Sequence, residues 1–130
     1  DEKRPERSQI CMATDNGNIG SLYSGDIYGL NLSADLVVLS ACETGLGKIS
    51  KGEGIIGLTR ALIYAGSNNL IVSFWRVNDA STSSLMADFY SNMLAGNGYA
   101  EALRLAKLKM INLEEHSSPY YWATFVLIGE

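Results

Sequence analysis

Three short runs of the chain are hydrophobic without interruption, at residues 36–39, 70–72 and 125–128. None of them alternates between apolar and polar positions, as a strand with one face in water does. A strand that is apolar on both faces belongs inside a sheet that helices cover on each side. The three runs therefore predict the buried strands of an α/β domain, and Phe74 extends the second of them.

Between these runs, apolar residues recur every three or four positions, which is the period of a helix with one buried face. We expect three helices. The first spans residues 55–65, the second begins after Asn78 or Asp79 as its N-cap, and the third spans residues 99–113. The expected buried positions are Ile55, Leu58, Leu62 and Ala65 in the first helix, Leu85, Phe89 and Met93 in the second, and Leu103, Ala106, Met110 and Leu113 in the third. Gly66 is expected to close the first helix.

The N-terminal part of the chain has a different pattern. Residues 10–13 and 19–23 flank a turn rich in Asp, Asn and Gly, which predicts a β-hairpin, and Ser24 is the expected N-cap of one helical turn after it. Residues 1–8 are expected to form a solvated arm. The order of the elements predicts a crossover α/β fold with a mostly parallel sheet, and without linker-like segments residues 1–130 are expected to form one domain.

The composition narrows the class of protein. Of 130 residues, 47% are hydrophobic and 18% are charged, which excludes a disordered chain. The net charge of −4 argues against direct nucleic-acid binding, since that function needs a basic face. Two cysteines and one histidine make neither a disulfide framework nor a metal site, so we expect a cytoplasmic protein with no metal or other cofactor. No apolar run is long enough for a membrane span.

Cys42 is the residue whose position most favours chemistry. It follows the strand predicted at residues 36–39, and ligands of α/β sheets gather at the carboxyl ends of the strands. A thiol there can reach solvent and act as a nucleophile, although free cysteines are more often small buried residues. We assign Cys11 to that buried class. His116, the only histidine, lies in a loop before the last strand, and a surface or loop-packing role is favoured for it.

Other segments expected near the same edge of the sheet contain residues that suit ligand binding. Trp75 and Asp79 follow the second strand and can form a pocket for a long cationic side chain, or they can close the core and cap a helix. Residues 45–48 resemble a P-loop but lack its first glycine and its magnesium-binding hydroxyl. Residues 52–57 match GxGxxG but begin well after the strand, so nucleotide binding is not expected.

Three motifs that follow one another along the chain form a pattern specific enough to suggest a protein family. They are DLVVLSACETG at residues 35–45, SFWRVND at residues 73–79 and PYYWATFVLIG at residues 119–129. They resemble the CHAT family, caspase-like domains associated with tetratricopeptide repeats and related to separases and gingipains. The resemblance runs from about residue 9 to residue 130. It implies a caspase-like three-layer sandwich, with helices on both faces of the sheet, that lacks its N-terminal strands.

The resemblance implies a cysteine endopeptidase in which Cys42 is the nucleophile. Trp75 and Asp79 match residues that line the pocket for a basic side chain in the separase relatives, which favours cleavage after Arg or Lys. The family's catalytic histidine and an oxyanion-hole glycine precede the cysteine, so we expect both to lie upstream of this chain. The chain also lacks an initiator methionine and is expected to be an excised piece, inactive alone.

The same resemblance implies partners. They are a protein or peptide substrate, an N-terminal half of the same protein with tetratricopeptide-type repeats and, as in some relatives, an RNA-guided effector complex as the regulator. No direct contact with nucleic acid or membrane is expected. The alternative is a non-catalytic pseudo-peptidase that binds or scaffolds a peptide, and a His-Gly pair on the preceding strand of the full-length protein would separate the two.

Overall fold

The computed structural model describes residues 9–13, 19–40 and 53–129. These residues belong to two compact units, each with its own core. The first unit comprises Asp1–Val37 and Glu43–Leu70, and the second comprises Val38–Cys42 and Ile71–Glu130. The predicted arm at residues 1–8 lies outside the described residues, and the single-domain interpretation stays a prediction.

The neighbouring strands β3 (Ala34–Leu39) and β4 (Ser67–Ser73) run parallel to each other. The N–H of Leu32 donates to the carbonyl of Ala65 at 2.7 Å, and the N–H of Ala34 donates to the carbonyl of Gly66 at 3.2 Å. Both segments therefore advance in the same direction into their strands, as the continuous apolar runs predicted.

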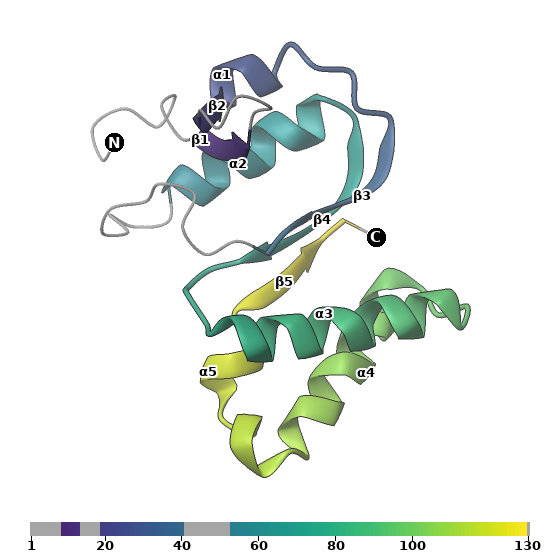
Figure 1. Ribbon diagram of the computed structural model, residues 1–130. Helices are drawn as coiled ribbons and strands as arrows, with labels where there is room; N and C mark the ends of the chain where they lie inside the picture. The colour runs from purple at the N-terminus through teal and green to yellow at the C-terminus, as the bar shows by residue number, and fades with distance from the viewer. Residues whose placement is uncertain (1–8, 14–18, 41–52, 130) are drawn as a thin grey trace. The chain divides into compact units, whose positions relative to one another are not determined.

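The last strand, β5 (Phe125–Ile128), completes a sheet of order β3-β4-β5 and runs antiparallel to β4 (Figure 1). The N–H of Phe74, just after β4, donates to the carbonyl of Thr124, just before β5, at 3.1 Å. The end of one strand thus lies beside the beginning of the other. The predicted α/β class is confirmed, and the caspase-like three-layer arrangement stays a prediction.

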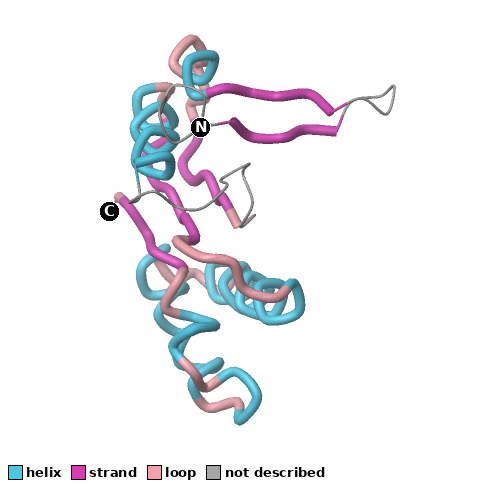
Figure 2. The backbone as a smooth tube through the Cα atoms, turned by 90° about the vertical axis from the view of Figure 1, so that its left-hand side faces the viewer, coloured by secondary structure: helices cyan, strands magenta, loops and turns pink. Residues whose placement is uncertain are grey.

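The first unit contains the predicted hairpin, formed by β1 (Gln9–Ala13) and β2 (Ile19–Tyr23) (Figure 2). The helices described in this unit are α1 (Ser24–Ile27) and α2 (Glu53–Tyr64). The buried apolar side chains of this unit are Ile27, Leu58, Ala61, Leu62, Ala65 and Leu70. The predicted positions Leu58, Leu62 and Ala65 therefore face a core, as expected, whereas the burial of Ile55 lies outside what the structure describes.

Two predictions in the first unit are wrong. Cys11 is exposed on β1, because successive side chains of a strand point to opposite faces and a short apolar run does not bury both. Ser24 is the first residue of α1 and is buried, whereas Tyr23 is the N-cap. The carboxylate of Asp26 accepts the N–H of Tyr23 at 3.1 Å, and this bond starts the helix one residue earlier than the pattern indicated.

Gly66 connects α2 to β4 in a conformation that other residues avoid. Its φ is +106°, and a Cβ at this position would lie 3.3 Å from the backbone nitrogen of Ser33. We expect Gly66→Ala to lower the free energy of unfolding by about 1–3 kcal/mol, measured by denaturant titration. Gly25→Ala is the matched control, because nothing lies within 4 Å of the added Cβ. An equal loss in both variants would contradict this explanation.

The second unit is built around the helices α3 (Asp79–Leu94) and α4 (Tyr99–Ile111), which pack against each other. Their buried apolar side chains are Leu85, Met86 and Phe89 on α3 and Ala102, Leu103, Ala106 and Met110 on α4. An ion pair of 2.6 Å between Lys109 and Asp88 joins the two helices at the surface. Most of the positions predicted to be buried on these two helices are therefore correct.

The end of α4 differs from the prediction. The pattern placed Leu113 in the helix, but α4 ends at Ile111 and Leu113 is 40% exposed. The side-chain amide of Asn112 donates to the carbonyl of Leu108 at 3.0 Å and so competes for the last carbonyls of the helix. Two short helical turns follow, η2 (Glu114–His116) and α5 (Pro119–Trp122). None of the described helices has the length and apolar content for a membrane crossing.

Candidate functional site

The site begins at the edge of the sheet where β3 and β4 end. Because these two strands are parallel and β5 is antiparallel, their carboxyl ends and the amino end of β5 share this edge. Cys42 follows β3 in the sequence and lies outside the described residues, as does the glycine-rich segment after it. The described part of the site is therefore the segment after β4 and the segment before β5.

Thr124 connects these two segments through two hydrogen bonds. Its hydroxyl oxygen accepts the N–H of Trp75 at 2.9 Å and donates to the carbonyl of Trp75 at 3.0 Å. The threonine is fully buried, so both bonds are shielded from competing water. The main chain at Trp75 is consequently fixed where it leaves the sheet.

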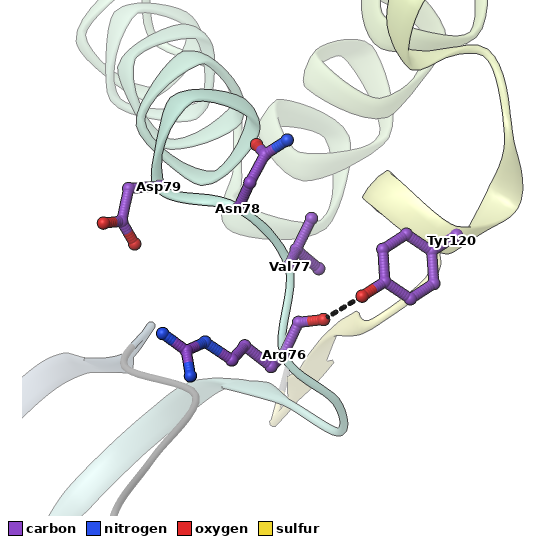
Figure 3. A pocket seen from close by; sticks show the side chains of 5 residues that line it. All are labelled: Arg76, Val77, Asn78, Asp79 and Tyr120. Carbon is purple, nitrogen blue, oxygen red and sulfur yellow. Dashed lines mark hydrogen bonds between the residues drawn. The ribbon is translucent and has the colours of Figure 1, made fainter.

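Tyr120 joins the same two segments a second time. Its carbonyl accepts the indole N–H of Trp75 at 2.8 Å, and its phenol O–H donates to the carbonyl of Arg76 at 2.6 Å (Figure 3). Ser118 is the N-cap of the short helix α5, with Pro119 in its first turn, and this local structure sets the direction of Tyr120. Residues far apart in sequence thus meet at one edge of the sheet.

Asn78 ends the segment after β4 by capping α3. Its side-chain oxygen accepts the N–H of Ser81 at 2.8 Å and the hydroxyl of Ser81 at 2.6 Å. Of the two predicted caps, Asn78 is therefore the correct one. Asp79 is the first residue of the helix, where a carboxylate is favoured by the partial positive charge of the helix N-terminus.

A pocket of about 380 Å³ opens between these elements (Figure 3). The described residues that line it are Arg76, Val77, Asn78, Asp79 and Tyr120. Val77 is 3% exposed and anchors the segment to the core, whereas Arg76, Asp79 and Tyr120 are exposed. The pocket thus combines a carboxylate, a guanidinium group and an aromatic ring.

The structure separates the two residues predicted to bind substrate. Asp79 lines the pocket, as its position after β4 suggested. Trp75 is not among the described lining residues, and its indole N–H is used in the bond to Tyr120. The sequence did not predict a place for Tyr120 in the pocket. The missing information was the direction of β5, which brings its amino end to this edge.

His116 takes part in the packing of the loop before β5, as predicted. Its ring lies 5.0 Å from that of Tyr121 in an edge-to-face arrangement, and the ring of Tyr121 lies 5.4 Å from that of Tyr120. Within the described ranges, no group of three or more His, Cys, Asp or Glu residues is placed to hold a metal ion.

Comparison with known proteins gives one family and two relatives. The CHAT domain family matches residues 1–130. Tetratricopeptide repeat protein 28 of Mus musculus is 34% identical over 108 residues, and the Homo sapiens protein of the same name is 35% identical over 108 residues. Each match covers 83% of this chain and 4% of the relative, so the chain corresponds to a small part of these proteins.

Proposed function

Because the chain belongs to the CHAT domain family, we propose that it carries the nucleophile and part of the substrate pocket of a cysteine endopeptidase. The observation that carries this proposal is the shared edge of the sheet. The chain continues from the end of β3 towards Cys42, and the pocket lined by Asp79 and Tyr120 lies at the neighbouring end of β4. A nucleophile and a side-chain pocket on adjacent strand ends are what peptide cleavage requires.

The proposed reaction is acyl transfer through Cys42. The thiolate attacks the carbonyl carbon of the peptide bond, a C–S bond forms, and the C–N bond breaks as the amine leaves with a proton from the general acid. Water then attacks the thioester, releases the new carboxyl group and returns the thiol. The proton carrier is a histidine that also activates the thiol.

We infer that this histidine comes from a segment outside the chain. His116 is the one histidine of the sequence, and its ring contacts Tyr121 in the loop before β5. In the family pattern that the motifs resemble, the catalytic histidine and an oxyanion-hole glycine precede the cysteine, and we propose the same order here. The relatives are named for tetratricopeptide repeats, so we propose that such repeats in the same protein sense a regulatory partner.

The proposed substrate has an arginine or lysine before the cleaved bond. Asp79 provides a carboxylate in the pocket, and an ammonium or guanidinium group gains a charge-assisted hydrogen bond from it. Trp75 supports this pocket through its bonds to Tyr120 and Thr124. In this scheme Asp79 contacts the substrate, and Trp75 holds the segment that carries Asp79.

The test is covalent labelling of the full-length protein with an arginyl electrophile that traps cysteine peptidases. We expect one adduct, which peptide mapping by mass spectrometry assigns to Cys42. Cys11→Ala should be labelled to the same extent as the wild type, although the thiol of Cys11 is exposed on β1 and open to non-specific reagents. An electrophile with a neutral side chain should label Cys42 more slowly.

Absence of labelling in the presence of the activating partner would refute the peptidase. If arginyl peptides still bound, the chain would instead serve as a non-catalytic peptide-binding module. Labelling of Cys11 in preference to Cys42 would also refute the proposal, because it would show only the exposure of a surface thiol.

A further inference from the structure

Tyr120 reaches the pocket from a distant part of the sequence. Its phenol O–H bonds to the carbonyl of Arg76, 44 residues earlier in the chain, and its side chain lines the pocket that Arg76 lines. Tyr120 is 53% exposed, so water alone can satisfy its hydroxyl. A short bond of 2.6 Å to the main chain instead indicates that the bond fixes the position of Arg76.

The pocket segment, residues 76–79, is held at both ends. Tyr120 holds its start through the carbonyl of Arg76, and the side chain of Asn78 holds its end by capping α3. Arg76 and Asp79 carry opposite charges on this one segment. Which charge meets an incoming side chain therefore depends on the path of the main chain between them.

We propose that Tyr120 is a positioning residue that sets the preference of this pocket for a basic side chain, and this role rests on the peptidase function proposed above. Tyr120 acts through Arg76. The hydrogen bond to the Arg76 carbonyl holds the segment that carries Asp79, whose carboxylate lines the pocket on the side to which the Arg76 side chain extends (Figure 3). Without the bond, the segment moves, and Asp79 loses its alignment with the arginine or lysine of the substrate.

The test uses Tyr120→Phe, which keeps the ring and removes the O–H. The full-length protein carries Cys42→Ala, so that peptides bind without covalent reaction. Affinities for an arginyl peptide and for the same peptide with norleucine are measured by fluorescence anisotropy. We expect Tyr120→Phe to lower the affinity for the arginyl peptide about threefold to tenfold, which corresponds to the loss of one well-formed hydrogen bond. The affinity for the norleucyl peptide should stay unchanged.

Tyr121→Phe is the matched control, because this neighbouring tyrosine of α5 contacts Tyr120 and His116 through its ring. We expect it to change neither affinity. The inference fails if Tyr120→Phe weakens both peptides equally, if it leaves the discrimination intact, or if Tyr121→Phe has the same effect. It also fails if the parent protein does not prefer the arginyl peptide.

Labelling of intact Cys42 is measured in a separate preparation, so the two proposals are judged independently. A protein that binds arginyl peptides in a Tyr120-dependent way and is never labelled keeps the inference and loses the peptidase. A protein that is labelled at Cys42 but shows no dependence on the Tyr120 hydroxyl keeps the peptidase and loses the inference.

Discussion

Cys42→Ala is expected to lower the turnover of an arginyl peptide substrate by about a thousandfold or more, the largest effect of any single change in this chain. Removing the sulfur removes the atom that forms the covalent intermediate, and water alone is a much poorer nucleophile. The affinity for the peptide should be nearly unchanged, because the pocket at residues 76–79 is intact. The measurement is kcat with a fluorogenic peptide, together with Kd from anisotropy.

Cys11→Ala is the control for this experiment, since it removes an exposed thiol on β1 without touching the pocket segment. Its kcat should equal that of the wild type. Turnover in Cys42→Ala that stays within about tenfold of the wild type after repeated purification would count against the proposal. In that case another residue would be the nucleophile, and the role of Cys42 would be wrong.

The sequence predicted the elements of this fold where burial alone decides them. The strand at residues 125–128 has the predicted bounds, and α3 and α4 bury the side chains that their spacing indicated, Leu85 and Met110 among them. Apolar spacing records which face of an element meets the core. It does not record how a helix ends, and the side chain of Asn112 moved the end of α4 ahead of Leu113.

The direction of β5 was the more important feature that the sequence could not predict, because it determines which residues lie at the candidate site. A run such as residues 125–128 is equally apolar in either direction, so the pattern could not show that β5 opposes β4. That direction brings Thr124 and Tyr120 to the end of β4, where they bond to Trp75 and Arg76. Asp79 follows β4 closely in the sequence, so its place at this end of the strand could be predicted. It could not locate Tyr120, whose place depends on a contact between distant segments.

The second motif alone could not decide between the two roles considered for Trp75, pocket wall and structural support. An indole offers both a ring and an N–H donor, and the sequence does not say which of them is used. With the N–H bonded to Tyr120, Trp75 supports the junction between β4 and β5. Its predicted contact with substrate stays a prediction, and we expect the proposed specificity to depend most on the charge of Asp79.

Asp79→Asn should therefore change the substrate preference more than any other change in the pocket. The amide keeps the size of the side chain but removes the charge that attracts an arginine or lysine. We expect kcat/KM for an arginyl peptide to fall about tenfold to a hundredfold, the range for a lost hydrogen bond between charged groups. The value for a norleucyl peptide should stay constant, and the loss should come from KM.

Two further variants separate this effect from a loss of fold. Asp79→Glu keeps the charge and should restore most of the preference, whereas a purely structural role of this charge at the start of α3 would change the cleavage of arginyl and norleucyl peptides alike. Asp88→Asn removes a carboxylate from the same helix that pairs with Lys109 and does not line the pocket, so it should leave the preference unchanged. If Asp88→Asn and Asp79→Asn reduced arginyl cleavage equally, the effect would follow the stability of α3, and the carboxylate of Asp79 would have no part in recognition.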